Sequence, residues 1–216
     1  MNLAFNKVNQ LPVRTWSWLG VNDITMEDTI PDIRPYTKNP LKSDVGAFEK
    51  LDGSNHLWEK DEFISFRTGS GEEAARFVKE NKNTGISIQV PEGIRVKDPI
   101  FLKYELDDKD STVVDYNRIV AKEGSAVTVV MVYHSPDECP VFHGGLTFLL
   151  AEKNAVINLI QVQLLGDKAI HINNIGTKME NSGKINIIQA ELGGLKAVSG
   201  IYSALSGENS KMDRNN

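Results

Sequence analysis

A short element recurs along the second half of the chain at a nearly constant interval, and it restricts the possible folds more than any other feature. It reads EGSAVTVVMVY from Glu123, EKNAVINLIQVQ from Glu152 and ENSGKINIIQAE from Glu180, with spacings of 29 and 28 residues. GENSKM, with Glu208, opens a further copy 28 residues on. Each interval also holds a second run of strand-forming residues. A fixed period made only of strands and turns is typical of a solenoid, in which each repeat packs on its neighbours.

We therefore expect a mainly β protein whose core is a right-handed parallel β-helix, with two strands per turn of about 28 residues. An antiparallel sandwich also has short, evenly spaced strands, but it does not require the same Glu-x-x-Ala/Gly opening to recur in phase. The recurrence predicts that Ala126, Ala155 and Gly183 occupy equivalent positions on successive turns.

The first part of the chain has a different pattern. We predict a small N-terminal helical and irregular region over residues 1–85, followed by a β-helix domain over residues 86–216. LPVRTWSWLGVND predicts a short helix, and the prolines after it predict irregular structure. A clearer helix follows Ser70, which is a candidate cap with Glu73 three residues on, and Gly85 is its expected end. The glycines of RTGSGEEA would suit an anion at this helix start, but no Gly-Lys-Ser/Thr follows, so capping is the favoured interpretation.

Composition excludes several classes of protein. The net charge of −5 and the lack of a basic run argue against nucleic-acid binding. No apolar run approaches the roughly 20 residues that cross a bilayer. The start, MNLAFNKVNQLPVR, does not resemble a secretory signal, and the single cysteine, Cys139, fits a reducing compartment. The sequence thus predicts a cytoplasmic protein without membrane or nucleic-acid partners.

Few residues suggest chemistry. His143 and His171 are 28 residues apart and so are expected on adjacent turns, close enough to share a metal ion, with Cys139 nearby in sequence as a soft ligand. The alternative is that both histidines form hydrogen bonds in or beside the sheet and Cys139 is an ordinary thiol. No nucleophile with a base and no phosphate-binding loop is evident, so we expect no catalytic residues and no enzyme activity.

Three segments resemble successive turns of a known family. ISIQVPEGIRVKDPIFLKY, RIVAKEGSAVTVVMVYHS and INNIGTKMENSGKINIIQAELGG are similar to the core of the SufB/SufD family of iron–sulfur cluster assembly scaffolds, and LPVRTWSWLGVND is similar to SufD-type openings. Family members are generally longer and carry a C-terminal helical segment that docks the ATPase SufC. The resemblance therefore implies that the β-helix is incomplete at its C-terminal end, after Asn216.

The resemblance also implies a function. In SufB the turn that matches GTKMENSGKINIIQ carries a cysteine linked to sulfur transfer, and Met179 stands at the matching position, which favours SufD because a thioether cannot form a persulfide. We expect a SufD-like scaffold subunit that acts with SufB-like and SufC-like proteins. It would have no cofactor of its own, an iron–sulfur cluster would form in the full complex, and the β-helix would allow a homodimer. The alternatives are a carbohydrate-active β-helix enzyme, which would need paired carboxylates, and a self-associating structural solenoid.

Overall fold

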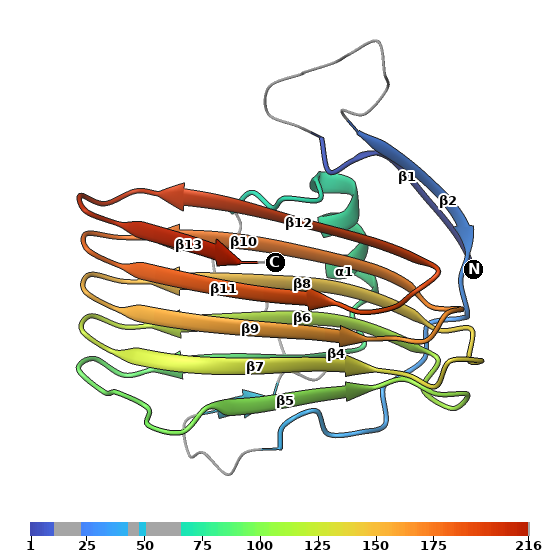
Figure 1. Ribbon diagram of the computed structural model, residues 1–216, viewed down its shortest axis with the longest axis horizontal. Coiled ribbons are helices and arrows are strands. Elements are labelled where there is room, and N and C mark those ends of the chain that lie inside the picture. Colours follow the sequence, from blue (N-terminus) through green and yellow to red (C-terminus); the bar gives the residue numbers. More distant parts are fainter. Residues whose placement is uncertain (11–22, 43–47, 51–65, 216) are drawn as a thin grey trace.

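The computed structural model describes residues 1–10, 23–42, 48–50 and 66–215 (Figure 1). The elements in these ranges are β1 (Asn2–Val8), β2 (Ile24–Thr29), β3 (Phe48–Lys50), α1 (Glu72–Asn81), β4 (Thr84–Val90), β5 (Ile100–Glu105), β6 (Thr112–Ala121), β7 (Ala126–His134), β8 (Phe142–Ala151), β9 (Val156–Leu164), β10 (Ile170–Met179), β11 (Lys184–Glu191), β12 (Lys196–Leu205) and β13 (Lys211–Asn215).

Two parallel sheets face each other and form a β-helix. One sheet has the order β12-β10-β8-β6-β4, with β3 antiparallel at its edge, and the other has the order β13-β11-β9-β7-β5. The chain alternates between the sheets and rises as a right-handed coil from β4 to β13 (Figure 1). The predicted fold class is confirmed, and GENSKM does open another turn, because β13 pairs in register with β11.

At one corner of each turn of the coil stands a residue in the left-handed backbone region. That region favours glycine and is tolerated by asparagine, which explains four of the five corner residues, with Ser182 as the exception. A backbone hydrogen bond links neighbouring corners, for example from Gly124 N to Lys153 O at 2.9 Å. The corner residues have φ between 56° and 68° and are Gly93, Gly124, Asn154, Ser182 and Asn209.

The predicted equivalence of Ala126, Ala155 and Gly183 is wrong by one residue at its first member. Ala126 lies opposite Val156, so the preceding residue, Ser125, matches Ala155, which in turn matches Gly183. Val156 N accordingly donates to Ser125 O at 2.9 Å. The turn that begins at Ala126 is 30 residues long and the next is 28, a difference that matching the glutamates had obscured.

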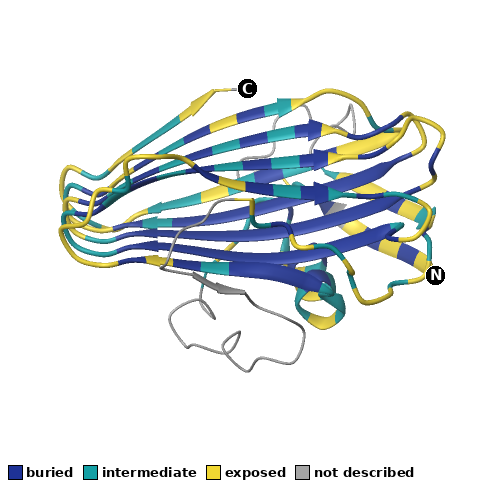
Figure 2. Cartoon of the chain, turned by 90° about the horizontal axis from the view of Figure 1, so that it is seen from below, coloured by how far each residue is buried: buried dark blue, intermediate teal, exposed yellow. Residues whose placement is uncertain are grey.

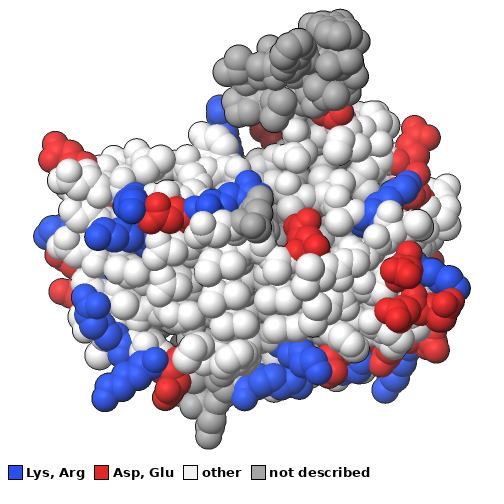
Figure 3. Space-filling model, viewed as in Figure 1, with Lys and Arg blue, Asp and Glu red and all other residues white. Residues whose placement is uncertain are grey.

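The two sheets differ in what covers their outer faces (Figure 2). Strands β6 and β8 are buried along their whole length, whereas β7 and β9 alternate between buried and partly exposed residues. The reason is that an apolar cluster joins α1 and the β1–β2 pair to the outer face of β6, β8 and β10. The outer face of the other sheet is turned to the viewer in Figure 3, and much of its centre is uncharged while charged side chains gather toward the periphery.

The predicted helix after Ser70 is confirmed as α1, but its expected cap and end are not. Gly71, with φ of 100°, stands at the N-cap without a side-chain hydrogen bond, while the Ser70 hydroxyl donates to Asn173 O at 2.9 Å. The helix ends at Asn81, and Gly85 lies inside β4. The Ser70 hydroxyl thus bonds to the backbone of β10 and does not cap α1.

The N-terminal region contains an antiparallel pair, β1 with β2, that the sequence analysis did not anticipate. The helix predicted from LPVRTWSWLGVND falls almost wholly outside the described residues, and the division at residue 85 stays a prediction. In the described ranges α1 is the helix present, and its ten residues are too few to span a bilayer.

Candidate functional site

The interior of the β-helix is divided into an apolar half and a polar half. Strand side chains alternate in direction, and the parallel register places inward residues of successive turns in columns. The apolar half, near the corners with positive φ, contains Ile119, Ala121, Val127, Val129, Leu149, Ala151, Ile157, Leu159, Met179, Ile185 and Ile187. The polar half, toward the other end of the strands, also contains apolar residues such as Val113, Leu165 and Ala169. Its buried polar residues are Tyr104, Asp115, Asn117, Tyr133, His143, Gln161, Gln163, His171, Asn173 and Gln189.

Two columns become more polar as the coil proceeds. Residues Leu102, Met131, Gln161 and Gln189 lie in one column, and residues Tyr104, Tyr133, Gln163 and Glu191 lie in the next. A buried polar group costs free energy unless it has a partner. The polar half is therefore held together by a hydrogen-bond network.

Asp115 is the centre of that network, although its side chain is fully buried. Its Oδ2 accepts hydrogen bonds from the Tyr133 hydroxyl at 3.1 Å and from the Asn117 amide. Its Oδ1 lies 2.5 Å from Nε2 of His143. Tyr104 extends the network, because its hydroxyl donates to Asn117 Oδ1 at 2.8 Å. The Asp115 carboxyl group thus contacts three side chains at once.

The two histidines meet inside the polar half. His143 and His171 are register partners on β8 and β10, their rings stack with centroids 4.7 Å apart, and their Nδ1 atoms are 2.7 Å apart. One proton lies between these nitrogens. If His143 donates from Nε2 to the Asp115 carboxylate, its Nδ1 accepts from Nδ1–H of His171. Burial, with a smaller effect of His143, lowers the pKa of His171 well below its usual value, so His171 is neutral.

Gly145 makes room for this arrangement. It lies between Asp115 and Asn173 in one inward column. A Cβ at this position would be 2.9 Å from Cε1 of His143 and 3.3 Å from Oδ1 of Asn173. The missing side chain therefore lets the His143 ring reach the carboxylate of the preceding turn.

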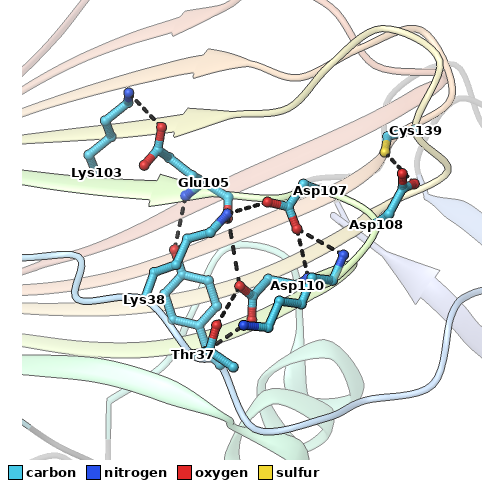
Figure 4. Close-up of polar contacts among 10 residues, drawn as sticks. Thr37, Lys38, Lys103, Glu105, Asp107, Asp108, Asp110 and Cys139 are labelled. Atoms are coloured by element: carbon cyan, nitrogen blue, oxygen red, sulfur yellow. Dashed lines mark hydrogen bonds and ion pairs between the residues drawn. The ribbon is translucent and has the colours of Figure 1, made fainter.

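Cys139 does not join the histidines. Its thiol donates to Oδ1 of Asp108 at 2.9 Å, in the turns that follow β5 and β7 (Figure 4). This hydrogen bond to a carboxylate, together with burial, raises the pKa of Cys139 to about 11. The structure thus brings two of the three predicted metal ligands together and leaves the third elsewhere. Within the described ranges no three side chains of the His, Cys, Asp and Glu types form a metal-binding group.

The acidic residues near Cys139 have structural partners (Figure 4). Lys38 Nζ lies 2.6 Å from Asp107, and Thr37 donates to Asp110 from its backbone N and from Oγ1, at 2.9 and 2.8 Å. Hydrogen bonds from the backbone N of Asp110 and from Lys38 lower the pKa of Asp107. These contacts fasten residues 36–38 to the turn after β5.

The sequence analysis missed Asp115, the residue on which the network depends. A signal was present in TVVDYNRIVA, where Asp115 and Asn117 stand two residues apart in a strand that is mostly apolar on either side of its polar middle. Alternation alone could not show that these positions point inward, because β6 is buried on both faces.

One comparison with known proteins adds a finding to this geometry. The family model described as SUF system FeS cluster assembly, SufBD core domain, matches residues 104–216, more than half of the chain. The comparison with curated proteins gave no match.

Proposed function

Because the chain belongs to the SufB/SufD family of SUF-system proteins, which serve iron–sulfur cluster assembly, we propose that it is a SufD-like scaffold subunit. It would work in the cytoplasm with a SufB-like subunit and a SufC-like ATPase. Its contribution is shape and docking, and the cluster is cargo of the complex. The family match favours this role over a carbohydrate-active enzyme or a purely structural solenoid.

The protonation state of Cys139 is the observation that carries the proposal. A sulfur-accepting subunit needs a thiolate. Cys139 is held as a thiol by its hydrogen bond to Asp108, with a pKa of about 11. Met179, which the resemblance matches to a SufB cysteine, is fully buried in the apolar half between Ala151 and Leu205. Neither sulfur atom suits persulfide chemistry, which supports a SufD-like role.

Two measurements test the proposal. Co-expression with SufB-like and SufC-like proteins is expected to give a complex containing one copy of each scaffold type, with ATP hydrolysis that depends on the SufC-like subunit. Incubation with a cysteine desulfurase and cysteine, followed by mass spectrometry, is expected to leave Cys139 free of persulfide.

Asp108→Asn is the matched variant for the sulfur experiment, because it removes the charge that keeps the thiol protonated while retaining the shape of the side chain. We expect its thiol to react faster with iodoacetamide than the thiol of the original chain. Persulfide on Cys139 of the original chain would contradict the SufD-like role, as would a stable complex that excludes the SufB-like subunit.

A further inference from the structure

The polar half of the β-helix contains a narrow cavity at the ends of β9 and β11, near the start of β10. It is too tight for a water molecule, and it is lined by Tyr133, Gln161, Gln163, His171, Asn173, Gln189, Ala190 and Glu191.

Each side-chain donor atom of the lining has at least one partner. Gln161 Nε2 faces the Met131 sulfur at 3.5 Å, and the Asn173 and Gln189 amide nitrogens both donate to Gln161 Oε1, at 2.7 and 3.1 Å. Gln163 is also used at both ends, since Nε2 donates to Gly193 O and Oε1 accepts from Leu192 N. Tyr133 donates to Asp115.

What remains is a set of acceptors. Gln189 Oε1 and Asn173 Oδ1 are buried without a hydrogen-bond partner, on residues that are 5% and 2% exposed. Glu191 adds a carboxylate, one oxygen of which is bound by the Ser199 hydroxyl. His171 uses Nδ1 toward His143, which leaves Nε2 as its remaining polar atom.

The Asp115–His143–His171 chain sets the character of that last atom. When His143 donates from Nε2 to Asp115, His171 carries its proton on Nδ1 and presents a lone pair at Nε2. Metal-binding histidines are oriented in this way, by a hydrogen bond from the other ring nitrogen toward a carboxylate or another acceptor. Here Asp115 orients His171 through the imidazole of His143, which lies between them.

We propose that this cavity binds a divalent first-row transition-metal ion, with His171 Nε2, Gln189 Oε1 and Glu191 as ligands and Asn173 beside them. Two buried acceptors without a partner, beside a carboxylate, suit a cation, and the imidazole nitrogen favours a transition metal over Mg²⁺ or Ca²⁺. The ion is also smaller than the water molecule that the cavity excludes.

Titration of the full chain with Co²⁺, followed by calorimetry and by the visible absorption of the ion, tests the site. One Co²⁺ per chain is expected, and Mg²⁺ at the same concentration is not expected to compete. His171→Gln and Gln189→Leu should each weaken binding at least about tenfold, and Asp115→Asn should weaken it about tenfold through the loss of orientation. Gln189→Glu should strengthen binding, because it adds a negative charge.

His134→Gln is the matched control, since His134 is an exposed histidine at the end of β7. Unchanged binding in this variant is expected. The proposal would be overturned by no Co²⁺ binding to the original chain, by equal binding in Gln189→Leu and Gln189→Glu, or by loss of binding in His134→Gln. The Gln189 pair decides the question even if His171→Gln fails to fold. Because the isolated chain is titrated, the result is independent of the proposed role in a SUF complex.

Discussion

The two halves of the β-helix interior solve the same packing problem with different chemistry. In the apolar half, columns of aliphatic side chains fill the space between the sheets, and each contact is nondirectional and replaceable. In the polar half, the same backbone carries Asp115, His143 and His171, whose hydrogen bonds fix one geometry. The comparison teaches that uniform solenoid turns do not require a uniform interior. Well-packed apolar residues are often at least as stabilising as a buried ionic network, so the network in the polar half calls for a separate reason.

The strongest test of this contrast removes the centre of the polar half. Asp115→Leu deletes the acceptor for Tyr133, Asn117 and His143 and leaves three buried groups without their partner. We expect a loss of about 4 kcal/mol in the free energy of unfolding, measured by urea denaturation. A variant as stable as the original chain would show that the network contributes nothing to folding.

The apolar half should respond less to a single truncation. Leu159→Ala removes a fully buried side chain from the column that also contains Val129 and Ile187, and we expect a loss of about 3 kcal/mol. Leu164→Ala, at a side chain that is 39% exposed, is the control and should change the unfolding free energy by less than about 1 kcal/mol. Equal effects of the two substitutions would contradict the assignment of the apolar half.

Gly145 tests whether the two histidines are held by tight packing. Gly145→Ala places a Cβ against the His143 ring, and we expect a loss of about 2 kcal/mol from overpacking. In a His143→Ala background the same change should cost much less, because the ring is absent. A double-mutant cycle by urea denaturation measures this coupling. Additive costs would refute the role given to Gly145.

The smallest expected effect is on the pH dependence of the free energy of unfolding, to which His171 of the polar half contributes. The folded chain keeps His171 neutral, whereas the unfolded chain binds a proton below its ordinary pKa of about 6.5. The stability that His171 contributes is therefore present above about pH 6.5 and is lost as pH falls, by at most about 1.4 kcal/mol per pH unit. Between pH 7 and 5.5, His171→Gln should flatten this slope, while His134→Gln should not. An unchanged slope in His171→Gln would mean that its imidazole is protonated in the fold.

Much of the fold followed from the recurring element. The in-phase spacing and the two strands per interval predicted the right-handed parallel β-helix, and Ser70 with Glu73 marked the start of the helix. The equivalence of residues was less secure, because spacing measured between glutamates differs by one residue from spacing measured between backbone partners. The shift is visible at Glu152, which in backbone register matches Lys122 and not Glu123 of the preceding copy. Glu152 and Lys122 form an ion pair at 2.6 Å.

The site shows which features the sequence by itself could predict and which it could not. It determined that His143 and His171 would lie on adjacent turns, since equal spacing along a solenoid means vertical neighbours. It did not determine that both rings point inward, that Asp115 meets them, or that Cys139 is tied to Asp108. These facts depend on which face of each strand is covered, and α1 and the β1–β2 pair decide that by burying the outer face of one sheet only. Local sequence fixes the period, but which residues become interior is a property of the assembled layers, because burial is set by what packs on each face.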